Sequence, residues 1–297
     1  TTYESIKLMR KAPFVGILAF SIVLFMMPIG HMVMVLIEFI FGHHYKYPAA
    51  TLLGLFGALF LLIGTKSENE NMGTLLGFFS GIFIWTGWVE FSFVYFASHL
   101  NIAPLIENGE VVTKPEYLLM PSSIGIFFAT VLFFFFNKDT RCNFFRWFHR
   151  HLKLKVGKPS SVRNRTISSI TAMETIYITW FFYIILLLVY DESLFGQYPL
   201  ATYSMFFISL VWSLYLFIQL IKFQIMAPAI RYAIPTVIIF WNTVEILGRW
   251  NFFEEIWVQP QIFITEMSLI VIAFISVTVL SIYSSNKTEK IHKIKNV

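Results

Sequence analysis

The stretch GWVEFSFVYF, residues 87–96, contains one ionisable residue, Glu90, among aromatic and aliphatic neighbours. It belongs to an apolar run over residues 73–98. An α-helix of about 20 such residues crosses the hydrocarbon core of a bilayer. A carboxylate is costly there unless it faces the interior of a bundle, so Glu90 bears on both the fold and the function.

The composition of the whole chain is that of a membrane protein. Its 297 residues are 57% hydrophobic and 13% charged, with a mean hydropathy of +0.69. A soluble domain carries about 25% charged residues. The single cysteine, Cys142, excludes an intrachain disulfide and a multi-cysteine metal site. The formal net charge of +5 follows the distribution of loops and does not indicate a nucleic-acid partner.

Apolar runs recur along the chain and predict an all-α polytopic membrane protein, with about eight transmembrane helices in one bundle and a single domain over residues 1–297. Helices are expected because an open sheet edge in lipid would leave backbone groups unpaired. The predicted spans are residues 14–41, 49–65, 73–98, 121–137, 168–190, 200–221, 233–249 and 261–284.

The distribution of basic residues supports this number of spans. Eight spans place both termini on one side, and that side holds 19 of the 22 Lys and Arg residues. Cytoplasmic loops of membrane proteins carry such an excess. The sequence therefore predicts an integral protein of the plasma or inner membrane, with both termini cytoplasmic.

The connection over residues 138–167 is basic and amphipathic. On a helix, Phe144, Phe145, Phe148 and Leu152 fall on one face. We expect this segment to lie in the headgroup region, where each basic residue adds about 1 kcal/mol of attraction to anionic lipid. A loop that only sets topology and a docking site for another membrane subunit are the alternatives. The expected contacts to anionic lipid at the cytoplasmic face are Arg141, Arg146, Arg150, Lys153 and Lys155.

Carboxylates inside the predicted spans are the main functional signal. Spans one, three and seven run outward, which places Glu38, Glu90 and Glu245 at similar depth. Intramembrane acids face a bundle interior or a cavity and mark ion or proton pathways. The predicted ion- or proton-binding residues toward the extracytoplasmic side are Glu38, Glu90, Glu245, Glu266 and His31, with Glu174 as an inner relay.

The same residue types suit a divalent metal. Imidazole and carboxylate groups are metal ligands, and the candidates are Glu38, Glu90, His31 and His99. The chain nevertheless has no dense ligand motif such as HxxxH or ExxH, so no cofactor is assigned.

Each carboxylate also has a structural explanation. Glu245 and Arg249 are four residues apart, the spacing of an intrahelical ion pair. Glu38 and Glu266 are shallow enough to reach the headgroups. Glu90 in its protonated form would hydrogen-bond a neighbouring helix.

The most favoured function is proton- or cation-coupled transport. The alternatives are a non-catalytic subunit or scaffold of a membrane complex, and a membrane metalloenzyme that acts on a lipid or small apolar substrate. No catalytic residue is assigned, and whether the protein is an enzyme stays open at this stage.

Overall fold

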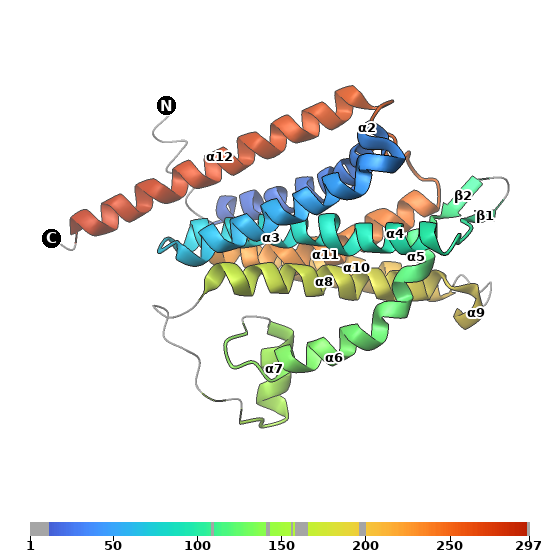
Figure 1. Cartoon of the computed structure of the whole chain (residues 1–297). Helices are drawn as coiled ribbons and strands as arrows, with labels where there is room; N and C mark the ends of the chain where they lie inside the picture. The colour runs from blue at the N-terminus through green and yellow to red at the C-terminus, as the bar shows by residue number, and fades with distance from the viewer. Residues whose placement is uncertain are drawn as a thin grey trace.

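The computed structural model describes residues 12–107, 110–140, 143–155, 157, 166–195 and 200–295. Within them the chain is a helical bundle with one small β-hairpin (Figure 1). Eight segments are long and apolar enough to cross a membrane, which confirms the predicted all-α membrane fold. These segments are Phe14–Gly42, His44–Lys66, Glu70–His99, Pro115–Phe135, Ile167–Tyr190, Leu200–Leu220, Met226–Arg249 and Ile264–Tyr283.

The first two spans form one continuous helix, α2 (Phe14–Lys66), which is broken only at Gly42. The sequence predicts a connection of several residues between them. The structure replaces it with a kink, because Gly42 adopts a φ of 58° and glycine reaches this region without steric cost.

The third span combines α3 (Glu70–Ile84), a π-helical turn η1 (Trp85–Glu90) and α4 (Phe91–His99). A hairpin of β1 (Leu105–Glu107) and β2 (Glu110–Thr113) follows, with antiparallel pairing. The remaining elements are α5 (Pro115–Leu119), η2 (Met120–Ser123), α6 (Ile124–Phe135), α7 (Asn143–His151), α8 (Ile167–Tyr190), α9 (Glu192–Phe195), α10 (Leu200–Leu220), α11 (Met226–Arg249) and α12 (Ile264–Lys295).

The fourth and seventh spans begin six and seven residues earlier than predicted, and each has a proline in its first turn. Pro115 occupies the first turn of α5, and Pro228 the first turn of α11. Proline is tolerated there, since the first backbone N–H groups of a helix have no intrahelical partner.

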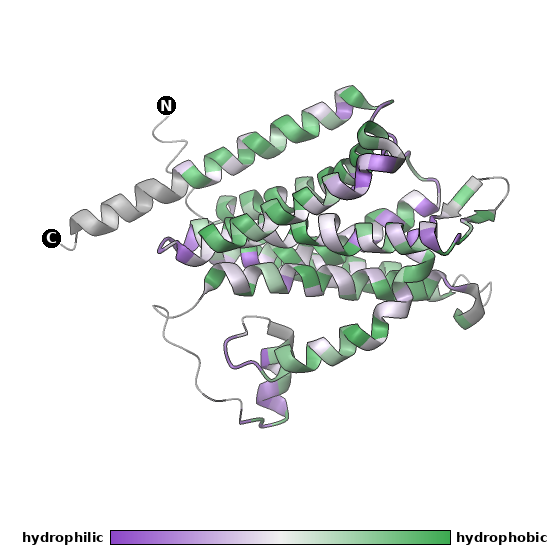
Figure 2. Cartoon of the chain, in the orientation of Figure 1, coloured by the Kyte–Doolittle hydropathy of each residue, from purple (hydrophilic) through white to green (hydrophobic). Residues whose placement is uncertain are grey.

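The bundle has two distinct ends, which serve as reference points below. The hairpin end holds β1, β2 and the Gly42 kink, and the α7 end holds α7 and the first residues of α2, α3, α8 and α11 (Figure 1). Apolar residues run along the spanning helices, whereas hydrophilic residues gather at the two ends and on α7 (Figure 2).

Helices α2, α3, α8 and α11 form the packed centre of the bundle. By contrast, α6, α10 and α12 bury little of their surface and expose large apolar side chains such as Phe133, Val211 and Ile272. Surfaces of this kind suit contact with lipid, where only backbone groups must be satisfied internally. The chain is therefore an integral membrane protein.

Helix α7 packs one face on the end of α6. Phe145 and Phe148 contact Phe135, with ring centroids 5.9 and 6.0 Å apart. Leu152 follows the helix and is exposed. Of the residues expected to contact lipid, Arg141 lies outside the described residues. The other four are exposed: Arg146, Arg150, Lys153 and Lys155.

Candidate functional site

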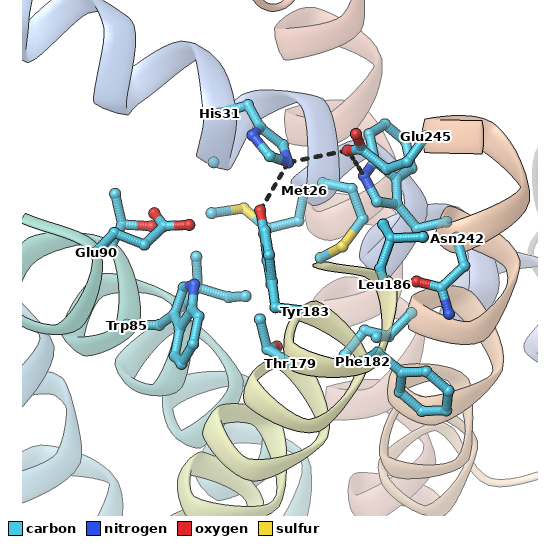
Figure 3. A pocket seen from close by; sticks show the side chains of 16 residues that line it. Met26, His31, Trp85, Glu90, Thr179, Phe182, Tyr183, Leu186, Asn242 and Glu245 are labelled. Atoms are coloured by element: carbon cyan, nitrogen blue, oxygen red, sulfur yellow. Dashed lines mark hydrogen bonds and ion pairs between the residues drawn. The ribbon is translucent and has the colours of Figure 1, made fainter. Parts of the chain in front are cut away.

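A small cavity of about 60 Å³ lies inside the membrane-spanning part of the bundle, nearer the hairpin end. An imidazole and two carboxylates from three helical segments line it: His31 on α2, Glu90 on η1 and Glu245 on α11 (Figure 3). A water molecule needs about 15 Å³ on this measure, so the cavity has room for about four. A lipid or a drug-sized ligand does not fit.

His31 is the centre of the hydrogen-bond network in the cavity. Its Nε2 lies 3.4 Å from Glu245 Oε1 and 3.2 Å from the Tyr183 hydroxyl. Trp241 Nε1 donates to the same Glu245 oxygen at 2.5 Å. A ring nitrogen without a proton accepts a hydrogen bond, and one with a proton donates. Unprotonated Nε2 therefore accepts from Tyr183, and protonated Nε2 donates to Glu245.

The π-helical turn determines the position of Glu90. Trp85 and Glu90 are the first and last residues of η1, and both line the cavity. Five residues correspond to about 140° of rotation on an α-helix of 3.6 residues per turn, so an α-helix would point the two side chains apart. The i→i+5 bonding of a π-turn brings such residues onto one side, and π-turns occur frequently at functional sites.

Close backbone packing supports this turn. A Cβ atom on Gly87 would lie 2.5 Å from the Gly54 nitrogen and 2.6 Å from the Ala50 oxygen, both on α2. Only glycine therefore allows η1 to approach α2 at this point. Trp88 Nε1 donates to the Thr51 carbonyl at 3.2 Å and joins the same two segments.

Aromatic rings form the walls around the polar groups. Tyr183 is stacked between Trp85 and Tyr117, with ring centroids 5.8 and 6.0 Å away. The ring of His31 lies 6.2 Å from that of Trp241 in a stacked arrangement. These contacts hold Tyr183 and His31 in fixed orientations, since stacked rings have few alternative rotamers.

An apolar layer separates the cavity from the α7 end. It includes Ile22 of α2, Phe78 of α3 and Ile234 of α11, each at most 1% exposed. In the same part of the bundle, the Thr171 and Thr175 hydroxyls donate to carbonyl groups of their own helix. The Ser80 hydroxyl of α3 is also buried here, two residues after Phe78, and like the two threonines it carries no charge.

An ion pair lies at the α7 end itself. Arg231 of α11 is buried and donates from Nη2 to Glu70 Oε1 at 2.7 Å and from Nη1 to Thr74 Oγ1 at 2.8 Å. Both acceptors belong to α3, so this pair joins α3 and α11.

Polar contacts cover the hairpin end. The Arg249 guanidinium lies 4.1 Å from the centre of the Tyr190 ring and donates to the Thr113 hydroxyl at 3.4 Å. The structural explanation of Glu245 as a partner of Arg249 therefore does not hold, because no ion pair joins the two in the described chain. Glu245 has His31 and Trp241 as partners.

Glu255 lies between α11 and α12, outside the spans, and packs against Gly248. Burial, and to a lesser extent the nearby Glu245 carboxylate, raises the pKa of Glu255 to about 7, against a smaller opposing effect of Lys114. A carboxylate that titrates near neutrality thus lies close to the cavity on the side of the hairpin end.

The other predicted site residues lie outside the cavity. Glu38 pairs with Lys46 at 3.0 Å, which supplies a counter-ion of its own. Glu266 is exposed at the start of α12. Glu174 is half-buried on α8 at the level of the apolar layer, and His99 is exposed and stacked on Tyr95.

The structure therefore brings together His31, Glu90 and Glu245 of the predicted set. The four metal candidates do not meet, because Glu38 and His99 have partners elsewhere. Among the described residues, no group of three His, Cys, Asp or Glu side chains is arranged to hold a metal ion.

Several residues of the site are absent from the sequence-based set. Tyr183 and Asn242 are uncharged, and nothing in their spacing links them to His31. Trp241 offers a signal, since it precedes Glu245 by four residues and so shares its helical face. Glu116, which the sequence places in a loop, is buried at the start of the fourth span.

The fold and the site together define a class, an eight-span helical membrane protein with a histidine–carboxylate cavity. Comparison with known proteins gives no matching family model, no matching curated protein and no matching solved structure. The function is therefore argued from the geometry.

Proposed function

We propose that this membrane protein binds protons or small cations in the cavity and uses them to drive transport. The observation that supports it is the meeting of His31, Glu90 and Glu245, from three helical segments, within the membrane. Ionisable groups at this depth are expensive and mark proton or ion pathways. A structural role would require only one such group with one partner.

The apolar layer favours a carrier over a channel. A channel needs a continuous polar path, whereas Ile22, Phe78 and Ile234 close the way from the cavity toward the α7 end. A carrier alternates between states open to one side and to the other. In this proposal the structure represents a state closed at the α7 end. Glu174 takes part only in the state that is open at the α7 end.

We also propose the orientation and the lipid contacts expected from the sequence. The excess of basic residues at the α7 end supports a cytoplasmic position for that end, and the cavity then lies toward the extracytoplasmic side. The exposed basic residues of α7 then face the anionic headgroups of the inner leaflet.

The alternatives have weaker support. A metalloenzyme acting on a lipid needs a larger cavity than about 60 Å³ and a set of metal ligands. A scaffold or non-catalytic subunit has no need of a histidine–carboxylate network. It would co-purify with other membrane proteins and would be insensitive to the loss of the Glu245 carboxylate.

The proposal is tested by measuring protonation of the purified protein. Infrared difference spectra between acidic and alkaline buffers report the carboxyl C=O band, and a pH-sensitive dye inside liposomes reports proton flux. We expect Glu245→Gln to remove a titrating carboxyl band, and both Glu245→Gln and His31→Gln to abolish flux driven by a membrane potential.

The matched control is Glu38→Gln, because Glu38 lies in the same helix as His31 but pairs with Lys46 outside the cavity. It should leave the flux unchanged. Equal flux in wild type and Glu245→Gln would exclude the proposal, and so would equal loss in Glu38→Gln.

A further inference from the structure

Three polar groups lining the cavity have no hydrogen-bond partner in the described chain. They are Asn242 Nδ2, Thr179 Oγ1 and Trp85 Nε1, and their residues are 4%, 7% and 3% exposed. The Trp85 nitrogen is on the edge of the ring nearer Glu90 (Figure 3). Native proteins pair nearly all such buried groups with protein or ordered water, and these three line a cavity large enough to hold water.

We infer that the cavity holds a cluster of water molecules that joins Glu90 to the His31–Glu245 pair, and that the species bound there is a proton rather than a metal cation. This inference rests on the proposed function and names its substrate.

The chemistry of the unpaired groups favours a proton with water over a metal cation. Trp85 Nε1 and Asn242 Nδ2 are donors only. Trp85 Nε1 has the Glu90 carboxylate near it, whereas Asn242 Nδ2 has no acceptor in the described chain. A metal cation offers no acceptor and would repel both N–H dipoles. Water accepts from them and still donates to the carboxylates, so it satisfies both kinds of group.

The size and polarity of the cavity agree with water. Room for about four molecules is enough for a short chain, and a buried water requires two to four polar partners. Cavities that stay dry are lined by apolar groups alone. Here the lining includes His31, Glu90 and Glu245 in addition to the three unpaired groups.

The position of Glu90 gives the water a role. Figure 3 shows Glu90 on the opposite side of Tyr183 from Glu245, whereas Tyr183 and Glu245 both contact His31 Nε2. The titratable groups that line the cavity are these four side chains. A proton leaves the Glu90 carboxyl for a water oxygen as that water gives one of its own protons to the Tyr183 hydroxyl, and Tyr183 gives its original proton to His31 Nε2. Glu90 becomes a carboxylate, the imidazole becomes an imidazolium beside Glu245, and the water and Tyr183 are regenerated.

Thr179→Val tests the water directly, because it removes the hydroxyl with little change of shape. If the Thr179 hydroxyl binds water, its loss lowers the apparent melting temperature and slows proton uptake several-fold. If the hydroxyl is dry, removing an unpaired polar group leaves stability unchanged or raises it, which overturns the inference.

The matched control is Thr278→Val on α12. Its hydroxyl is also buried without a partner, but Thr278 does not line the cavity. The inference predicts that Thr179→Val lowers the melting temperature. Thr278→Val should leave the melting temperature unchanged or raise it. Equal shifts would overturn it.

Radiolytic footprinting of the wild-type protein gives an independent measurement that needs no variant. Bound water produces hydroxyl radicals in place, so Trp85 and Tyr183 should be oxidised several-fold faster than Phe78 in the apolar layer, which is 0% exposed. Equal rates would overturn the inference.

Addition of Na⁺ or K⁺ at constant pH separates protons from metal cations. The inference predicts no change in melting temperature, and a rise that Glu90→Gln abolishes would overturn it. If Glu245→Gln removes proton binding while Thr179→Val has no effect, only the water cluster is excluded. If Glu245→Gln has no effect either, the proposed function itself fails.

Discussion

The partners of Glu245 explain why this carboxylate is held in place inside the membrane. Trp241 approaches the Oε1 atom from the same helix, and His31 approaches it from α2. Arg249, which is closer in sequence than His31, is held by Tyr190 and Thr113 instead. A fixed positive charge beside Glu245 would keep it ionised, whereas a histidine partner leaves the pair free to gain and lose a proton.

Glu255 provides a prediction about pH at the residue scale. Its pKa of about 7 in the folded protein exceeds the ordinary value of 4.5. Since the folded state holds this proton more tightly, the stabilisation is complete below about pH 4.5 and is lost as the pH rises through about 7. After allowance for screening at this partly exposed site, the loss is on the order of 1–2 kcal/mol.

The measurement is the apparent melting temperature as a function of pH in wild type and Glu255→Gln. The variant should lack the decline between about pH 4.5 and 7 and should be the more stable protein at alkaline pH. Glu254→Gln is the control, because Glu254 is adjacent to Glu255 in the sequence but its own side chain is exposed. Parallel curves for wild type and Glu255→Gln would contradict the prediction.

At the scale of elements, the π-turn η1 converts a helical span into part of a site. It gives Trp85 and Glu90 a common side and leaves Gly87 against α2, where no side chain fits. The turn therefore depends on a contact between helices as well as on its own hydrogen bonds.

Gly87→Ala should disturb both the packing and Glu90. Its Cβ meets backbone atoms of Ala50 and Gly54, which cannot move aside as a side chain can, so we expect a loss of about 1–3 kcal/mol. Proton uptake should fall as well, because η1 orients Glu90.

Gly125→Ala on α6 is the control, since no atom lies within 4 Å of the added Cβ. Thermal denaturation in detergent measures both variants. Equal melting temperatures for the two would show that η1 tolerates a side chain at position 87.

These elements also show how far the sequence alone could lead. Hydropathy predicts the eight spans because each must be apolar over a fixed length, whatever its neighbours. The Gly42 kink and η1 depend on tertiary packing, and the assumption of 3.6 residues per turn hides the common face of Trp85 and Glu90.

The same reasoning applies to the site. Depth in the membrane can be counted from the sequence, so His31, Glu90 and Glu245 were found. The position of a residue within the plane of the membrane cannot be counted from the sequence. The sequence therefore groups Glu38 and Glu266 with the cavity residues, although neither lines the cavity. Tyr183 carries no charge, and only the packing of α8 against α2 reveals it.

Helix α7 gives a second prediction at the element scale. Its exposed Arg146 and Arg150 should each contribute about 1 kcal/mol to binding anionic headgroups. The double variant Arg146→Gln/Arg150→Gln should therefore bind anionic lipid roughly thirtyfold more weakly.

Native mass spectrometry of lipid adducts measures this directly. Zwitterionic lipid is the control, since its binding should be the same in wild type and variant. Unchanged retention of anionic lipid would leave α7 as a connection that only sets topology.

At the scale of the whole molecule, α11 links the cavity to the closed α7 end. It carries Glu245 near one end and Arg231 near the other, with Pro235 between them. A proline removes the hydrogen bond to the carbonyl four residues earlier, here that of Arg231, and so weakens the helix at this point. A movement of the Arg231 segment relative to the Glu245 segment would open the apolar layer, as a carrier requires.

Glu70→Gln should favour that opening. Within the described chain it leaves the buried Arg231 guanidinium with Thr74 as its remaining hydrogen-bond partner and no counter-ion, which costs about 1–3 kcal/mol in the closed state. In a Cys142→Ser background, a cysteine introduced by Ala233→Cys lies between Arg231 and the cavity, where Ala233 is 0% exposed. Its labelling by a membrane-impermeant thiol reagent from the α7 side should be faster with Glu70→Gln.

The control is Glu68→Gln, since Glu68 is exposed on the same side. Equal labelling with both substitutions would mean that the Arg231–Glu70 pair only fastens α3 to α11, and that the carrier opens elsewhere.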